Sequence, residues 1–397
     1  MLEPERVDQL LRSPGVGRVF DGQRFHQATG DGWTVTEALV DAGAGVGGYR
    51  ESLNEPLLRA AQAILRLLTE SGVGGVRVGS SSWAEQAHFR ALLSQAGPTA
   101  PALTGGGPVL TDSEPASDRE RWITGEGELV RALEVADLEG AGWVAVQTED
   151  PAFAAAAVRA AHARGLRVAL RGPVTTAAEL AEGDLFTGVA NLLRRRTTDR
   201  GLAVLSAWAS EPLDVPLRHA TDLAERGVGL TSELLSLHRG VFLREALQAP
   251  FLEENVPILP HVRWVMQMRR GTGYVAGRSA LRDHTGLAEP TRAEAKQAAE
   301  GWQRLTEAVG RLHADGVRIL PASTAPQLTL LPGLGLKEEL VTLAAAGVPL
   351  PDLLARATDR SWLGLAPRPL LLASDQDPGD AARFLARLTL WTELSEG

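Results

Sequence analysis

The chain has 397 residues, a formal net charge of −9, eight histidines and no cysteine. The lack of cysteine excludes thiol catalysis, thiolate metal sites and iron–sulfur clusters. Two of the 40 basic residues are lysines, Lys296 and Lys337, so a Schiff base or a carbamylated lysine has two candidates. We expect a cytoplasmic protein with no membrane or nucleic-acid partner, because the chain is acidic and has no apolar leader core and no run of about 18 apolar residues.

Short apolar segments alternate with longer segments of helical period along most of the chain, which is typical of βαβ units. The segments predicted as strands are 38–43, 73–79, 100–104, 142–147, 166–171, 202–206, 228–232 and 317–322. Three of the intervening helices are predicted to stop at Gly165, Gly227 and Gly316. This count predicts an α/β fold with a (β/α)8 TIM barrel, and a doubly wound open sheet is the alternative.

Other stretches lie outside this repeat or interrupt it. Residues 1–37 predict a reduced, β-rich accessory segment, residues 38–366 the barrel, and residues 367–397 a C-terminal tail with a helix. Residues 105–122 are polar and predict a long loop. Residues 233–290 predict a long excursion between the seventh and eighth strands, where barrel enzymes often carry functional loops.

Several segments, in the same order along the chain, resemble a known superfamily. Residues 39–46 (LVDAGAGV) resemble the first barrel strand of metal-dependent amidohydrolases, usually L-I/V-D-x-H-x-H. Residues 180–193, 227–238 and 353–365 resemble the loop after the fifth strand, the seventh-strand segment and the closing helix of dihydroorotases. Imidazolonepropionases are the competing match, because residues 322–324 resemble their eighth strand, G-T-D. Either resemblance implies a TIM barrel of the metal-dependent hydrolase type.

In that superfamily one or two Zn²⁺ ions are held by histidine and carboxylate ligands at the strand ends, and the metal generates hydroxide near neutral pH. The resemblance carries these ligand positions onto Gly43, Gly45, Ala145 or Thr148, Arg171, Ser206, and Ser323 or Thr324. Glycine has no donor atom, and arginine is a permanent cation that would repel Zn²⁺. We therefore interpret these positions as vestigial, with no metal, no cofactor and no catalytic residue.

Some polar side chains could form a residual site near these positions. The candidates are Glu149, Asp150, Arg171, Glu233 and His238. Arg171 is expected either to fill the vacated metal site through a salt bridge to Glu149 or Asp150, or to bind a small anion at the barrel mouth. Glu233 and His238 match the dihydroorotase seventh-strand segment, either as a retained pair or as a structural hydrogen bond.

The resemblance implies a catalytically inactive, dihydroorotase-like protein. Inactive chains of that type are structural partners of aspartate carbamoyltransferase in pyrimidine biosynthesis, so we expect that partner or a homo-oligomer. An active amidohydrolase that hydrolyses a cyclic amide is the first alternative, with Zn²⁺ held by Glu149, Asp150, Glu233 and His238. A small-anion binding protein that uses Arg171 is the second.

Overall fold

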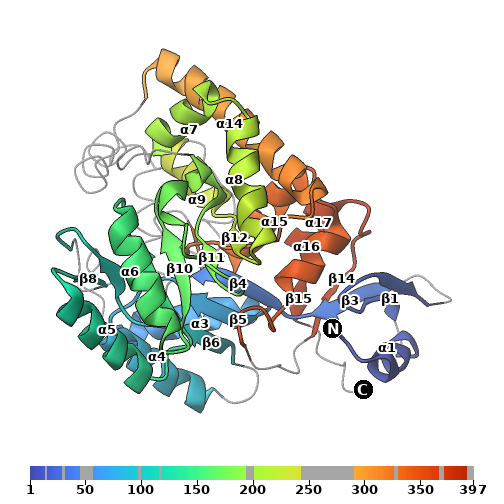
Figure 1. The fold of residues 1–397 in the computed structure, drawn as a ribbon. Coiled ribbons are helices and arrows are strands. Elements are labelled where there is room, and N and C mark those ends of the chain that lie inside the picture. Colours follow the sequence, from blue (N-terminus) through green and yellow to red (C-terminus); the bar gives the residue numbers. More distant parts are fainter. Residues whose placement is uncertain are drawn as a thin grey trace, which may run out of the picture.

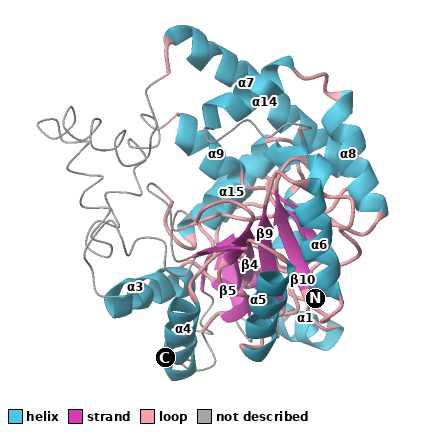
Figure 2. Ribbon diagram, turned by 60° about the vertical axis from the view of Figure 1, so that its left-hand side comes forward, coloured by secondary structure: helices cyan, strands magenta, loops and turns pink. Residues whose placement is uncertain are grey.

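The computed structural model shows a central group of strands surrounded by helices (Figure 2). It describes residues 1–13, 16–28, 32–44, 57–96, 100–115, 119–193, 201–242, 290–325, 330–365 and 371–390. The predicted excursion at 233–290 and the position Gly45 therefore lie largely or wholly outside the described residues.

Two sheets of parallel strands form the centre of the fold. The first has the order β4 (Leu39–Ala44), β5 (Val73–Val78) and β6 (Ala102–Gly105). The second has the order β13 (Ile319–Leu320), β12 (Gly229–Thr231), β11 (Leu185–Phe186), β10 (Arg167–Arg171), β9 (Trp143–Gln147), β7 (Val109–Thr111) and β8 (Glu120–Trp122). The two sheets meet where the backbone N–H of Ala42 donates to the carbonyl of Pro321, at 2.9 Å. The arrangement is consistent with a TIM-barrel-like fold, although the strand ladders of the described residues do not form a closed ring.

One apolar cluster draws its members from strands of both sheets. It contains Val40, Ala42, Ala102, Trp143, Ala169, Leu185, Leu320, Ala322, Leu363 and Leu365. Trp143 is its largest side chain, and the indole N–H donates to the carbonyl of Leu363 at 3.2 Å. The guanidinium groups of Arg77 and Arg167 lie 5.8 and 5.4 Å from the centroid of this ring. The ring therefore joins the apolar interior to two cations through its π face.

Helices follow most of the strands and cover them (Figure 1). They are α3 (Leu57–Glu70), α4 (Trp83–Gln95), α5 (Glu126–Leu138), α6 (Pro151–His162), α7 (Gly201–Ser210), α8 (Asp214–Glu225), α9 (Leu234–Val241), α14 (Arg292–Ala314), α15 (Leu334–Ala345) and α16 (Leu350–Ala357), with 3₁₀ turns at Val174–Thr176 and Val189–Leu192. Ser82 and Glu85 form a capping box at the start of α4. The predicted helix stops are confirmed, because Gly165, Gly227 and Gly316 have φ values of 71°, 75° and 81°, which favour glycine.

The prediction of a strand at 202–206 is wrong, because this segment lies in α7. Leu205 and Trp208, three residues apart, are buried on one face of that helix. The helix packs closely on α14 at Gly301, where a Cβ atom would lie 1.8 Å from the carbonyl oxygen of Leu205. The sixth strand is instead β11, whose two residues are too few to show an alternating pattern.

The prediction of one long polar loop at 105–122 is also wrong, since β7 and β8 lie within it. β7 pairs in parallel with β9, with Leu110 opposite Val146 and Thr111 opposite Gln147. Leu110 is buried in the main core, and this burial fixes the strand on the sheet.

A separate five-stranded sheet joins the first and last parts of the described chain, which lie side by side at the right of Figure 1. Its order is β15 (Thr389–Leu390), β14 (Leu371–Ser374), β3 (Trp33–Glu37), β1 (Val16–Phe20) and β2 (Phe25–Gln27). β14 runs antiparallel to β3, with Leu371 opposite Glu37 and Ser374 opposite Thr34. Two helices accompany the sheet, α1 (Pro4–Leu11) against β1 and α17 (Ala381–Ala386) against α15. Phe384, Leu385 and Leu388 are buried in the main core.

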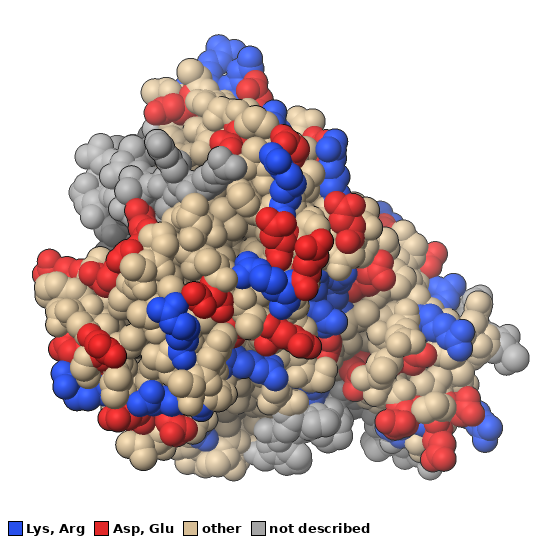
Figure 3. Space-filling view, in the orientation of Figure 1, with Lys and Arg blue, Asp and Glu red and all other residues tan. Residues whose placement is uncertain are grey.

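The surface of the described residues carries both signs of charge. On the face shown in Figure 3, acidic and basic side chains are interspersed. A search of the described helices finds none with the length and apolar character needed to cross a membrane.

Candidate functional site

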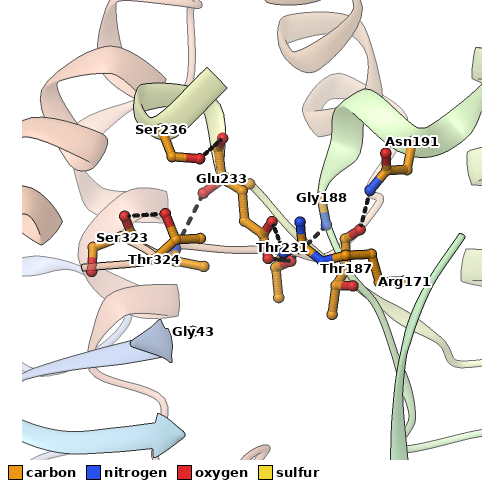
Figure 4. Close-up of polar contacts among 12 residues, drawn as sticks. Gly43, Arg171, Thr187, Gly188, Asn191, Thr231, Glu233, Ser236, Ser323 and Thr324 are labelled. Atoms are coloured by element: carbon orange, nitrogen blue, oxygen red, sulfur yellow. Dashed lines mark hydrogen bonds and ion pairs between the residues drawn. The ribbon is translucent and has the colours of Figure 1, made fainter. Parts of the chain in front are cut away.

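Residues from the carboxyl ends of several parallel strands lie close together (Figure 4). Gly43 lies near the end of β4, Arg171 ends β10, Thr231 ends β12, and Ser323 follows β13. Barrel enzymes carry their active sites at this end, because the loops after the strands gather there. We call this region the barrel mouth and build it from its contacts.

A salt bridge between Arg171 and Glu233 lies at the centre of the barrel mouth. The Glu233 side chain is 8% exposed, whereas the Arg171 side chain is 39% exposed. The Thr231 hydroxyl donates to Oε1 of Glu233 at 3.1 Å and accepts from the backbone N–H of Gly188 at 2.8 Å. The ion pair therefore connects β10 to the end of β12, and hydrogen bonds hold its carboxylate in place (Figure 4).

The expected salt bridges from Arg171 to Glu149 or Asp150 are not what the structure shows. Asp150 accepts from the backbone N–H of Ala152 at 2.8 Å and so caps α6. Glu149 is exposed. Arg171 does fill the barrel mouth through a salt bridge, but its partner comes from the seventh strand segment.

Arg77 on β5 is a second cation in this region, and it was not among the residues singled out from the sequence. Its side chain is 2% exposed, and its Nε–H donates to the carbonyl of Ala42 at 2.6 Å. Burial lowers the pKa of Arg77 to about 10, while Glu233 and Asp41 oppose that shift. Arg77 therefore keeps its charge at neutral pH. The sequence does hold a signal, since Arg77 interrupts the apolar strand VGGVRV.

The space beside Gly43, a ligand position predicted from the resemblance, is already filled. A Cβ atom at Gly43 would lie 3.1 Å from the Cβ of Ala322, 3.6 Å from Nη2 of Arg77 and 3.9 Å from Oε1 of Glu233. An imidazole at this position would have to displace the guanidinium or the carboxylate. Arg77 and Glu233 thus occupy the volume into which a metal ligand would project.

Asp41 and Ser323 join the first strand to the segment after the eighth. Asp41 is fully buried, and its Oδ1 accepts from the backbone N–H groups of Ser323 and Gly43 at 3.0 and 3.1 Å. The Ser323 hydroxyl donates to Oδ2. Burial raises the pKa of Asp41, and these hydrogen bonds act against that rise. Ser323 stands at a position that the resemblance assigns to an aspartate ligand, and its hydroxyl is used to hold the two strands together.

Ser206 is not at a strand end, so its assignment as the sixth ligand position is wrong. It lies in α7, because the segment predicted as the sixth strand is helical. The residue that follows the true sixth strand is Thr187, whose hydroxyl donates to the carbonyl of Leu170 at 2.9 Å. Thr187 therefore bonds to the neighbouring strand.

The two predicted fourth-strand ligand positions, Ala145 and Thr148, make structural contacts. Ala145 pairs with Ala169 in the β9–β10 ladder and has no donor atom in its side chain. The Thr148 hydroxyl donates to the Asp112 carboxylate at 2.7 Å.

Glu233 and His238 lie on the same segment but make separate contacts. The carboxylate of Glu233 binds Arg171. The His238 ring packs against Trp302 and Phe242, with ring centroids 4.6 and 4.7 Å apart. His238 therefore helps to pack α9 against α14.

Glu339 on α15 fixes the start of α9, which carries Glu233 at its N-cap. Its carboxylate accepts from the backbone N–H groups of Leu234 and Leu235 at 2.9 and 2.7 Å. Burial raises the pKa of Glu339 to about 7, although these hydrogen bonds favour the charged form. The neighbouring Glu338 binds Arg239 at 2.6 Å, and burial raises its pKa to about 7 as well. The helix α15 therefore holds the segment that positions Glu233.

Two residues of the barrel mouth have a left-handed backbone, Glu233 with φ of 53° and Thr324 with φ of 54°. They are the non-glycine residues with positive φ within the described part of the chain. Such conformations are costly for residues with a Cβ atom and concentrate at functional sites.

Thr324→Gly is expected to raise the free energy of unfolding by about 1 kcal/mol, because glycine adopts the positive φ without strain. Urea denaturation of the two proteins measures the difference. Thr342→Gly serves as the control, because Thr342 lies inside α15 and the same change there should destabilise the protein. A loss of stability in Thr324→Gly would contradict the expectation.

The described donor atoms at the barrel mouth do not fit a catalytic metal. A search of the described residues finds no group of three or more histidine, cysteine, aspartate or glutamate side chains that could hold a metal ion. Among the described residues, the cations Arg77 and Arg171 and the carboxylates Asp41 and Glu233 lie there and offset one another. Such a set can hold strands together and present guanidinium donors, but it offers no open ligand set to Zn²⁺.

Comparisons with known proteins place this architecture among solved structures. A bottromycin amidohydrolase matches with a TM-score of 0.63 and 18% identity over 98% of this chain and 89% of that chain. An A. niger ochratoxinase matches with a TM-score of 0.61 and 11% identity over 96% of this chain and 93% of that chain. A Xaa-Pro dipeptidase with methionine bound in its active site matches with a TM-score of 0.59 and 12% identity, covering 95% and 98%.

No protein-family model and no curated protein matches the sequence. Because the structural matches have low sequence identity, they bear on the fold and do not extend to dihydroorotase-like specificity. The chain shares its fold with a bottromycin amidohydrolase and a Xaa-Pro dipeptidase.

Proposed function

We propose that this chain is an amidohydrolase-fold protein without hydrolytic metal chemistry, in which two arginines and two carboxylates replace the metal centre. The salt bridge between Arg171 and Glu233 carries this proposal. It stands at a strand end that the superfamily resemblance assigns to a histidine ligand. Arg77 adds a second fixed cation beside Gly43, and two cations at this place oppose the binding of Zn²⁺.

The alternative of an active enzyme with a rearranged site needs Glu149, Asp150, Glu233 and His238 as ligands. Asp150 is used as a helix cap and Glu233 as the partner of Arg171. His238 packs between aromatic rings on α9 and α14. These contacts favour a non-catalytic role over that alternative.

The test is metal content and hydrolysis measured on the same preparation. Protein purified without chelator is expected to hold less than about 0.2 Zn²⁺ per chain, since a catalytic site needs three protein ligands. With added Zn²⁺ or Mn²⁺ it should not hydrolyse Xaa-Pro dipeptides, N-acyl amino acids or dihydroorotate. Glu233→Gln is the control for a contaminant. Hydrolysis by the wild-type protein that this variant loses would overturn the proposal, because the activity would then belong to the barrel mouth.

A narrower role, that of an inactive dihydroorotase-like partner of aspartate carbamoyltransferase, rests on the order of the matching sequence segments. Mixing the two purified proteins and measuring mass by light scattering tests it, with this chain alone as the control for a homo-oligomer. This role predicts a stable complex whose mass is the sum of both proteins. If the mixture shows only the masses of the separate proteins, the role is contradicted.

A further inference from the structure

Arg77 has hydrogen-bond donors that no described residue uses. Its Nε–H reaches the Ala42 carbonyl, but within the described ranges Nη1 and Nη2 have no acceptor. The side chain is 2% exposed, and its guanidinium lies over the Trp143 ring. A cation with little solvent contact and unused donors gains from any acceptor that reaches those donors. The site therefore favours a bound acceptor.

The two carboxylates near Arg77 are already used by other donors. Asp41 accepts from Ser323 and from the backbone of Gly43. Glu233 accepts from Thr231 and Arg171. Both carboxylates attract Arg77 through space, so they balance its charge without occupying its Nη donors.

Arg171 supplies a second guanidinium that solvent can reach. Its side chain is 39% exposed, and its bond to Glu233 uses Nη2. Arg77 and Arg171 interact electrostatically with each other, and both interact with Glu233. Two partly unused guanidinium groups therefore flank one carboxylate at the barrel mouth.

We propose that the barrel mouth binds a small monocarboxylate through Arg77 and Arg171. The planar guanidinium fork matches the two oxygens of a carboxylate, which gives paired hydrogen bonds. Asp41 and Glu233 offset the positive charge of the two arginines, so they disfavour a dianion such as hydrogen phosphate relative to a monoanion. This inference rests on the proposed function, since it takes the arginines as the groups that replaced metal ligands.

Acetate is the probe, and acetamide is its neutral counterpart of the same shape. Melting temperature and titration calorimetry are measured at constant ionic strength, with chloride replacing acetate. Acetate is expected to raise the melting temperature and acetamide to leave it unchanged. Hydrogen phosphate should bind more weakly than acetate.

Three variants locate the site. Arg171→Met is expected to weaken acetate binding at least about tenfold, and Arg77→Lys to weaken it because the fork is lost. Arg167→Lys is the matched control, because Arg167 also lies over Trp143 but donates to the Trp362 carbonyl near the start of β10. It should bind acetate as the wild type does. If Arg77→Lys fails to fold, Arg171→Met still decides.

An absence of acetate binding by the wild-type protein would overturn the inference, and so would equal binding by Arg171→Met. These outcomes differ from failure of the proposed function. Acetate binding together with metal-dependent hydrolysis would overturn the function and leave the carboxylate site in place. Neither binding nor hydrolysis would overturn the site alone.

Discussion

Glu233→Ala is expected to lower the free energy of unfolding by about 3 kcal/mol, because it removes the anion that stands between two cations. Arg171 would lose its salt bridge, and Arg77, which is 2% exposed, would lose the carboxylate that most offsets its burial. The left-handed backbone at Glu233 offers little relief, since alanine also carries a Cβ atom. Urea denaturation of the variant and the wild type measures the loss.

Two further proteins make this result interpretable. Glu179→Ala breaks the more exposed pair with Arg159 and should cost no more than about 1 kcal/mol. The double variant Glu233→Ala with Arg171→Met should be less damaged than the sum of its single changes, because the stranded Arg171 charge is gone. A Glu233→Ala loss no larger than that of Glu179→Ala would show that the ion pair is not the stabilising element described above.

The stability of the protein is expected to fall as the pH rises from 5 to 8, through Glu339. Its pKa lies near 7 in the folded chain, whereas the ordinary pKa of an exposed glutamate is 4.5. Between these values the folded chain holds a proton that the unfolded chain has released, so folding is favoured at the lower pH. The loss through this one group approaches about 3 kcal/mol once the pH passes 7.

Glu339→Gln isolates this contribution. A glutamine side chain at position 339 carries no titratable proton. The free energy of unfolding of the variant should therefore change less between pH 5 and pH 8 than that of the wild type. Glu294→Gln is the matched control, because Glu294 is exposed and hydrogen bonds with Thr291 lower its pKa. It titrates below this pH range, and the variant should keep the wild-type slope. Identical slopes in all three proteins would mean that Glu339 stays charged when buried.

The strands that sequence predicted well are those with long apolar runs. β9 and β10 lie close to the predicted 142–147 and 166–171. The strand β11 was not predicted, because its two residues are too few to show a periodic pattern. The segment 202–206 was predicted as a strand because the apolar run in α7 has the composition of a buried strand. The packing of α7 on α14 makes this segment helical, and the local sequence pattern carries no information about that packing.

The barrel mouth shows the same division. The place of Arg171 could be inferred from its segment, because a residue at the end of a parallel strand faces the mouth. The salt-bridge partner of Arg171 could not be inferred, because Glu233 and Asp150 both follow strands. The structure shows that Asp150 caps α6, so Glu233 is the partner. The role of Glu339 could not be predicted from the sequence, because it depends on how α15 packs against α9.

The five-stranded sheet has a consequence for the order in which the chain folds. β3 pairs with β14, whose residues follow it by more than 300 positions. At about 5–20 residues per second, the ribosome leaves that edge of β3 unpaired for tens of seconds. Open strand edges are templates for aggregation, so the nascent chain is most vulnerable at its beginning. The sheet is completed only when β14 and then β15 emerge.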